Sequence, residues 1–371
     1  MSKNQRVIPS TEQVERAIQI ARIASTNDES RAWGALNDAY LLELPAKEDW
    51  TFLLATSSLT TDARYNTGTA TVNTGATAVT FSSDVTLPTG VVGWRVKFTD
   101  NANVYDVTVR SNATACTIAP ALSEDRNVSS GAYNLFNPYY ALAGDFDRFP
   151  KNGGLQLWQG GKPTPVPEKP IQNHYNEQSA SPGRPEYCRL VAPNTAGVAR
   201  TELVPPPIKA YAMPYDYFYT PPPLRETTAG SCTVTASATS VAFQTGARIS
   251  EMTTGMFFRV DAFGTGADSE WYRILAVSEA NSTATLQTAF GVSGATSANY
   301  TVCSAPQFPL ILQHALMWDT VKRLLGDQND ATFTYADSMQ TAAINDAKRL
   351  YKSRVYSQPI ETILEDYQYR R

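Results

Sequence analysis

The sequence predicts an α+β protein: a helical bundle from the N- and C-terminal helices, a Pro-rich β core, and two inserted small β-sandwich or barrel modules. Three observations predict this class. Apolar residues recur at helical spacing near both ends of the 371-residue chain, more than half of its 23 prolines lie within residues 137–226, and one β-rich stretch occurs twice.

The repeated stretch comprises residues 68–133 and 230–300, each alternating β-branched or aromatic residues with small polar ones. Matched positions are, in order, Gly68 with Gly230, Val96 with Phe258, Tyr105 with Tyr272 and Tyr133 with Tyr300. The spacing of the later pairs is five residues larger, and residues 264–268 of a Gly-rich turn supply the difference. We therefore expect two copies of one module with about five or six strands; a merely similar Thr/Ala/Val composition is the alternative.

Both chain ends carry helical signals. A first helix is predicted to begin at Ser10 or Thr11, and a second to begin near residues 27–29 and stop before Pro45. Towards the other end, an apolar helix follows Phe308-Pro309 and ends at Gly326, a residue suited to a C-cap. A last helix is predicted from residues 327–331 to about Val355, and Pro359 then breaks the pattern.

Strands are expected between these helices and around the proline-rich segment. They are predicted at residues 51–58, 186–191, 199–204 and 209–219. Pro214 interrupts the last of them, which predicts an edge strand or a bulge.

The predicted segments follow from these signals. They are a helical bundle of residues 1–66 plus 304–358, a first inserted β module at 67–136, a Pro-rich β core at 137–228, a second inserted β module at 229–303, and an extended tail at 359–371. Each insertion is expected to leave and rejoin its parent at adjacent points.

Composition narrows the function. Hydrophobic residues make up 42% of the chain, enough for a core, whereas charged residues are only 18% and the formal net charge is −4. Nothing predicts the basic face that grips nucleic acid. The start lacks an apolar signal region and no run reaches the ~18 apolar residues of a membrane span, so we expect a soluble protein made in the cytoplasm.

The four cysteines lie far apart without metal-binding spacing. Buried free thiols are expected, with a bridge between Cys232 and Cys303 as the alternative.

No catalytic constellation is evident. Of the two histidines, His174 stands in a polar segment without ligand-spaced partners, and His314 on an apolar helix favours a structural role. The run Gly264-Thr265-Gly266 lacks the lysine of a phosphate-binding loop. We expect no enzyme activity and no cofactor.

Two acidic pairs and an aromatic cluster are candidate binding sites. Asp145 with Asp147 is interpreted as a turn, and Asp327 with Asp330 as a helix N-cap, rather than as cation sites. The cluster comprises Tyr211, Tyr215, Tyr217, Phe218 and Tyr219. Packing is favoured over stacking on sugars or bases, because basic residues do not interleave beyond Lys209.

Three segments carry a resemblance to a known family. They are ALNDAYLLEL followed by DW (35–44, 49–50), YFYTPPPL (217–224), and FP…HALMWDTVKRLLGDQNDATFTYADSMQTAAINDAKRLY (308–351). In this order they resemble the head-to-tail connector proteins of short-tailed bacteriophages, the adaptor or tail-tubular-A-like ring proteins. The repeated module is similar to small β inserts of phage neck and tail proteins, although the two inserts depart from compact helical adaptors.

The resemblance implies a structural virion protein of the neck or tail, assembled in the host cytoplasm. It implies a ring of about twelve copies, docked between the portal protein and the tail nozzle or tubular protein. DNA passes through the middle without sequence-specific binding, and capsid or tail fibres are further partners. No membrane is involved.

The C-terminal tail is the predicted partner-binding segment. It combines apolar, aromatic and arginine residues of the kind enriched at interfaces: Ile360, Ile363, Leu364, Tyr367, Tyr369, Arg370 and Arg371. We expect it to dock on the portal or a neighbouring subunit, with a frayed terminus as the alternative. Two other function classes stay open at this point: a carbohydrate- or host-binding phage tail module and a cell-wall hydrolase.

Overall fold

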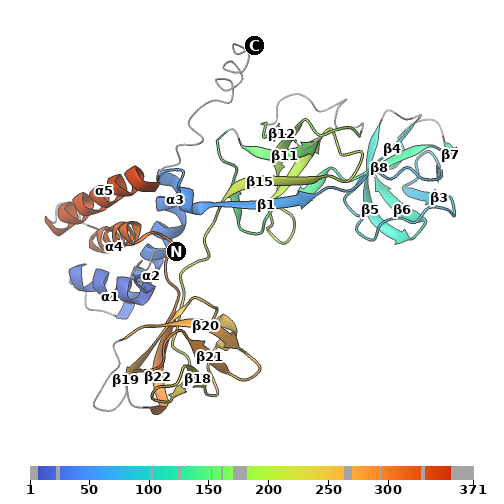
Figure 1. Ribbon diagram of the computed structural model, residues 1–371. Helices are drawn as coiled ribbons and strands as arrows, with labels where there is room; N and C mark the ends of the chain where they lie inside the picture. The colour runs from blue at the N-terminus through green and yellow to red at the C-terminus, as the bar shows by residue number, and fades with distance from the viewer. Residues whose placement is uncertain are drawn as a thin grey trace. The chain divides into compact units, whose positions relative to one another are not determined.

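The computed structural model describes residues 7–21, 26–99, 101, 103–123, 127–151, 153–159, 162–169, 182–262, 270–291, 294–326 and 331–351. These residues form helices and antiparallel sheets, so the predicted mixture of helix and strand is confirmed. By its internal contacts the chain divides into two units. The first comprises Met1–Phe52 and Pro221–Lys352, and the second contains Leu53–Thr220 (Figure 1).

Helices from both ends of the chain pack together in the first unit. They are α1 (Ser10–Ala21), α2 (Thr26–Asp38), α3 (Leu44–Lys47), α4 (Leu310–Leu325) and α5 (Ala331–Tyr351). The apolar α4 is the common partner, in contact with α1, α2 and α5, and its Leu312, Ala315 and Leu316 are fully buried. As predicted, α4 ends at Gly326, whose left-handed φ of 66° lets its N–H bond the Lys322 carbonyl.

The predicted stop before Pro45 is wrong. After α2 the chain makes a π-helical turn over Ala39–Glu43 and continues into α3, where Pro45 lies in the first turn. The Leu44 N–H bonds the Ala39 carbonyl in the π-helical turn, and Pro45, which has no N–H to donate, follows directly after this change in hydrogen bonding.

An aromatic cluster joins the end of this helical stretch to α4 and α5. Trp50 is fully buried, and its indole Nε1–H donates to the Leu44 carbonyl at 2.7 Å. Phe52 stacks beside Trp50 at 5.7 Å and meets the rings of Phe308 and Tyr351 at 5.4 and 5.8 Å. Segments from both chain ends are therefore held by one core.

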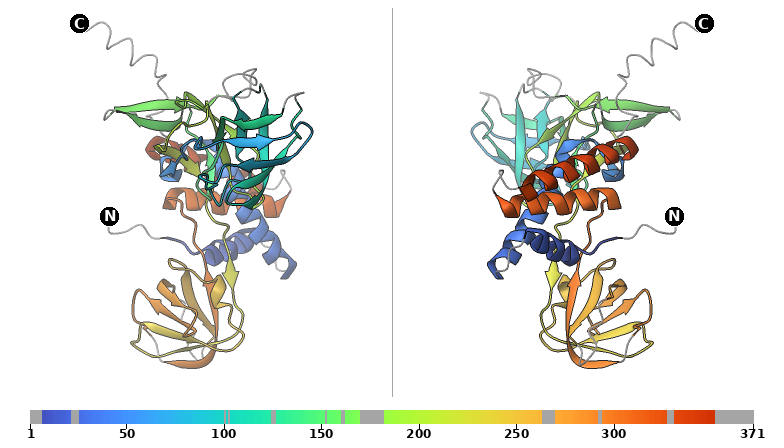
Figure 2. Two further views of the ribbon diagram at one scale, coloured as in Figure 1. Left: turned by 90° about the vertical axis from the view of Figure 1, so that its right-hand side faces the viewer. Right: turned by 90° about the vertical axis from the view of Figure 1, so that its left-hand side faces the viewer.

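The second module, β16–β22, belongs to the same unit. Its strands are β16 (Glu226–Thr227), β17 (Cys232–Val234), β18 (Ser240–Phe243), β19 (Phe257–Ala262), β20 (Tyr272–Ser278), β21 (Thr283–Leu286) and β22 (Ala295–Cys303). The strand order is β16-β22-β17-β18-β21-β20-β19, and β22 also pairs with β19, which closes the sheet into a barrel. Figure 2 shows the segments that enter and leave this module running side by side.

The first module, β2–β8, lies in the second unit. Its strands are β2 (Ala70–Val72), β3 (Ala78–Phe81), β4 (Arg95–Phe98), β5 (Val104–Asn112), β6 (Ala115–Ala119), β7 (Val128–Gly131) and β8 (Tyr133–Phe136). The order β7-β2-β3-β6-β5-β4-β8 repeats that of the second module. The consecutive strands β7 and β8 take the parts of the two halves of β22, pairing with β2 and β4 as β22 pairs with β17 and β19.

Matched side chains make matched bonds in the two modules. The hydroxyl of Tyr133 donates to the Thr67 carbonyl at 2.8 Å, and that of Tyr300 to the Ala229 carbonyl at 2.5 Å. Each acceptor immediately precedes a glycine with positive φ, Gly68 or Gly230. Each bond therefore connects the last strand of a module to the segment that enters it.

The aromatic contacts of these tyrosines are also repeated. Tyr133 meets Phe81 with ring centroids 4.8 Å apart, and Tyr300 meets Phe243 at 5.0 Å. The closing strand bends at matched serines, Ser130 and Ser297, with φ of 48° and 53°. The two stretches thus share topology, register and local geometry.

The remaining strands of the second unit are β1 (Leu54–Thr60), β9 (Tyr139–Ala141), β10 (Phe146–Arg148), β11 (Gly154–Gln159), β12 (Lys162–Pro167), β13 (Tyr187–Val191), β14 (Arg200–Val204) and β15 (Ala212–Tyr219). They form one sheet in the order β1-β15-β11-β12, with β10 on β15, and a second in the order β13-β14-β9.

The prediction that Pro214 marks an edge strand or a bulge is wrong. The strand β15 lies inside its sheet, and its ladder with β1 runs from Ala212 to Phe218 without a register shift. Pro214 is opposite Ser58 of β1, whereas β10 and β11 pair with β15 only at Tyr215, Phe218 and Tyr219. The proline therefore has a ladder neighbour on one side only, which is the condition under which a strand accepts it.

Candidate functional site

The residues predicted to bind partners, Ile360, Ile363, Leu364, Tyr367, Tyr369, Arg370 and Arg371, lie outside the described residues. So do His174, the pair Asp327 and Asp330, and the five-residue insertion at 264–268. Their roles stay predictions, as does the division into five segments.

Of the described polar candidates, the two aspartates contact other side chains, whereas the structural role predicted for His314 is not observed. Asp145 accepts a hydrogen bond from the Tyr217 hydroxyl at 2.8 Å, and Asp147 pairs with Arg148 at 2.6 Å. His314 is exposed on α4, and its neighbour Gln313 is buried instead. Among the described residues no group of three or more His, Cys, Asp or Glu side chains is arranged to hold a metal.

Gln313 is a connecting residue that the sequence did not reveal. Its Oε1 accepts from the Ile8 N–H at 2.9 Å, and its Nε2 donates to the Phe308 carbonyl at 2.7 Å. This buried amide ties the first described residues of the chain to the start of α4.

The predicted aromatic cluster is mostly internal. Tyr215, Tyr217 and Phe218 are 2%, 5% and 2% exposed, and Phe146 stacks on Tyr217 with centroids 5.7 Å apart. Tyr215 and Tyr217 belong to the core of the β15 sheet, and Phe218 is buried outside that cluster, so these buried rings are closed to a sugar or a base.

All four cysteines are free and buried, so Cys232 and Cys303 form no bridge. Burial raises the pKa of Cys116, Cys188 and Cys303 to about 11 and that of Cys232 to about 12. These thiols are protonated at neutral pH and therefore are poor nucleophiles.

A buried charge cluster fastens the first module to the sheet β13-β14-β9. Glu202 of β14, 1% exposed, pairs with Arg189 of β13 and with Arg95 of β4. Arg95 also donates to the Tyr139 hydroxyl at 2.6 Å and to Asp106 at 3.1 Å. A carboxylate held by two guanidinium groups from different elements fixes their relative positions.

Polar contacts likewise fasten the second module to α1. Arg259 of β19 reaches Glu15 of α1 at 3.1 Å, and Thr11 of α1 donates to Glu226 at 3.0 Å. Burial raises the pKa of Glu226. The N–H of Ser10 also bonds the Ser304 carbonyl at 3.1 Å, so α1 touches both segments that connect the module to the helices.

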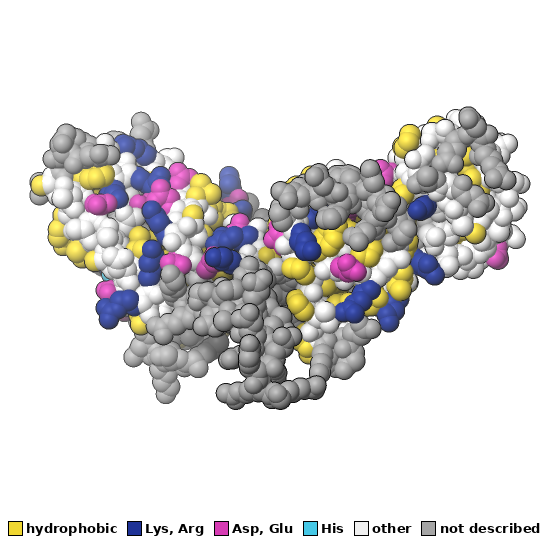
Figure 3. All heavy atoms as spheres, turned by 90° about the horizontal axis from the view of Figure 1, so that it is seen from above, with side chains coloured by type: hydrophobic (Ala, Val, Ile, Leu, Met, Phe, Trp, Pro, Cys, Tyr) yellow, Lys and Arg dark blue, Asp and Glu magenta, His cyan; other side chains and the backbone are white. Residues whose placement is uncertain are grey.

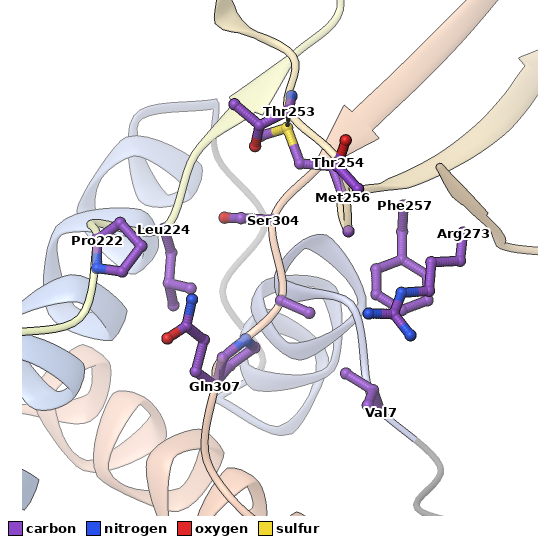
Figure 4. A pocket seen from close by; sticks show the side chains of 13 residues that line it. Val7, Pro222, Leu224, Thr253, Thr254, Met256, Phe257, Arg273, Ser304 and Gln307 are labelled. Atoms are coloured by element: carbon purple, nitrogen blue, oxygen red, sulfur yellow. Dashed lines mark hydrogen bonds between the residues drawn. The ribbon is translucent and has the colours of Figure 1, made fainter. Parts of the chain in front are cut away.

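A pocket of about 330 Å³ lies at this junction (Figure 4). The buried side chains of Leu224, Met256 and Pro306 form its floor. The rest of its lining comes from five places in the chain: Val7, Pro222, the other residues of 253–257, Arg273, and the other residues of 304–307. Because these residues are up to 300 positions apart in sequence, a short sequence motif cannot predict the pocket.

The pocket walls are held by hydrogen bonds. Ser304 and Arg225 join the two connecting segments, since the N–H of Ser304 bonds the Arg225 carbonyl at 2.9 Å and the N–H of Arg225 bonds the Ser304 hydroxyl at 2.7 Å. The N–H of Gln307 donates to the Tyr40 hydroxyl at 3.1 Å. A concavity built this way exists before any ligand arrives.

One cation faces the pocket. Arg273 of β20 is exposed beside Phe257 and forms no ion pair with the described residues (Figure 4). An apolar floor beside an unpaired guanidinium suits a ligand that offers apolar side chains together with a carboxylate.

Figure 3 shows basic and acidic side chains intermixed over the helices rather than a continuous basic face. Within the part of the chain that the structure describes, no helix has the length and apolarity to cross a membrane.

Comparison with protein-family models, curated proteins and solved structures finds no match to this chain.

Proposed function

We propose that this chain is a structural virion protein, an oligomeric ring adaptor that joins the portal vertex of a phage capsid to its tail and surrounds the DNA channel. The observation that carries the proposal is a β module used twice, each copy tied to a neighbouring element of its own unit by an ion pair, Arg95 with Glu202 in one and Arg259 with Glu15 in the other. Such a subunit presents large, rigid surfaces, which a ring requires because each copy must contact two neighbours through different faces.

In this proposal the N- and C-terminal helices are the bundle at the hub of the ring, and the Pro-rich β core stiffens the arm that carries the first module. The contacts of α4 with α1, α2 and α5 support a hub that holds both chain ends. The Glu202 cluster supports a stiff arm. The formal charge of −4 supports a channel wall that DNA passes without being gripped.

The partners of the proposed ring are further copies of the chain, the portal protein, and the tail nozzle or tubular protein. Capsid and tail fibres are candidate contacts of the modules. The tail residues from Ile360 to Arg371 are proposed to order on the portal or on a neighbour.

The deciding experiment is the mass of the purified protein, alone and with its portal, by native mass spectrometry. A ring-sized assembly of about twelve copies that binds portal is expected. A persistent monomer that binds glycan saturably would instead support a host-binding module, and lytic activity on cell walls would support a hydrolase.

Removing residues 359–371 tests the role of the tail. The truncated subunit should keep its circular dichroism spectrum and lose portal binding. Portal binding that survives the deletion would remove the tail from the proposal.

A further inference from the structure

We propose that the pocket between α1, the connecting segments and the second module receives the C-terminal tail, residues 359–369, of a neighbouring copy of this chain. The inference rests on the proposed function, because it takes the neighbour to be the next subunit of the ring.

The size of the pocket limits what can enter. A volume of about 330 Å³ is at the lower end for binding pockets, which span about 300–1,000 Å³. It accommodates one or two large side chains rather than a folded element. An extended segment that inserts apolar side chains at the floor of Leu224, Met256 and Pro306 fits this space.

The charge of the pocket selects among segments. Arg273 beside the apolar floor favours a chain in which apolar residues and carboxylates are interleaved. The tail has this pattern: Ile360, Ile363 and Leu364 alternate with Glu361 and Glu365, and Asp366 follows.

The other free end of the chain does not fit. Residues 1–6, which precede Val7 at the pocket, carry Lys3 and Arg6 and no carboxylate side chain. Their charge has the same sign as that of Arg273, so electrostatics favours the C-terminal tail over the N-terminal segment as the occupant.

The tail is long enough to leave its own subunit. Ile363 is twelve residues beyond Tyr351, the last residue of α5, and twelve extended residues span about 40 Å. An arm of that reach can connect adjacent copies, and the hydrogen-bonded walls of the pocket reduce the entropy lost on docking.

The test uses full-length chains with one new cysteine each, Thr254→Cys at the pocket in one copy and Ile363→Cys on the tail of another. The native thiols are buried, and their raised pKa values keep them protonated at pH 8, so mild oxidation reports the engineered pair. The expected product is a disulfide-linked dimer that contains one copy of each variant, identified by peptide mass mapping.

Charge variants sharpen the test. Arg273→Glu in the Thr254→Cys chain should lower the cross-linking rate at least about tenfold, and changing Glu361, Glu365 and Asp366 of the partner chain to lysine should restore it. Arg248→Glu is the matched control, because Arg248 lies in the same module, pairs only with Glu251 among the described residues, and does not line the pocket. An Arg273→Glu rate equal to that of the control would overturn the inference.

Two further measurements, the dependence of cross-linking on protein concentration and the binding of portal, test the source of the tail separately from the proposed function. A chain that carries both cysteines and closes on itself at every protein concentration overturns the assignment to a neighbour. A ring on the portal that forms without any cross-link overturns the inference and leaves the proposed function standing. Cross-linked copies that bind no portal support the inference and count against the proposed function.

Discussion

Replacing Glu202 by glutamine is expected to loosen the first module from its sheet. The change keeps the shape of the side chain but removes its charge, so the ion pair between Glu202 and Arg189, whose side chain is 14% exposed, is lost. Breaking a buried ion pair costs about 3–5 kcal/mol. The amide oxygen still accepts one hydrogen bond and Arg95 keeps Tyr139 and Asp106, so we expect a loss of about 2–3 kcal/mol.

Calorimetry measures this loss. For a unit of this size, 1 kcal/mol corresponds to about 2–4 °C in Tm, so the transition of the second unit should fall by roughly 5–10 °C. Hydrogen exchange should accelerate in β13 and β14 and stay unchanged in β19–β22 of the other unit, which serves as the internal reference.

The matched control is Asp106→Asn. Asp106 also pairs with Arg95, but its side chain is 59% exposed, and pairs of that kind contribute about 0–1 kcal/mol. Equal Tm values for the Glu202 and Asp106 variants would refute the conclusion that burial makes Glu202 the fastening residue.

Three further predictions concern the modules and the thiols. Tyr133→Phe and Tyr300→Phe should each lower the free energy of unfolding by about 1 kcal/mol, measured by urea titration, and unequal losses would contradict their equivalence. Gly230→Ala should destabilise by about 2–3 kcal/mol and Gly75→Ala by about 1, because both have positive φ but only at Gly230 would a Cβ lie 2.6 Å from a backbone nitrogen; comparable Tm shifts would contradict this. Stability should decline reversibly from about pH 8.5 to about 11, since the raised pKa of Cys188 lets the unfolded chain release that proton first. A Cys188→Ala variant should show a shallower decline, and an unchanged slope would exclude the thiol as its cause.

The sequence predicted what depends on local pattern. The end of α4 at Gly326 and the doubled module could be predicted, because a C-cap glycine and an alternating strand leave their marks within a few residues. Both errors concern prolines, Pro45 and Pro214. Pro45 is tolerated because of a π-helical turn, and Pro214 because a neighbouring strand pairs with β15 at few positions. Neither feature can be read from the sequence.

The candidate site could not be predicted for a related reason. The pocket joins Val7 and the two connecting segments to the second module, and Glu202 is buried in a strand whose sequence gives no hint of two arginines beside it. Residues that are far apart in sequence but meet in space leave no recognisable spacing along the chain. The tail was predicted as a binding segment from its composition, and that prediction awaits the cross-linking test.

The closure of the β16–β22 sheet into a barrel affects how molecules of this protein can associate when they are concentrated. Because β22 pairs on both sides, the strands that would otherwise border this sheet hydrogen-bond to one another. Among the described residues of this module, only the two-residue strand β16 ends the sheet, so the longer strands offer no open edge to a strand of another molecule at high local concentration. We expect a partner of this module to be recognised through side chains rather than through strand pairing. These side chains can differ between the two copies of the module while the backbone stays the same.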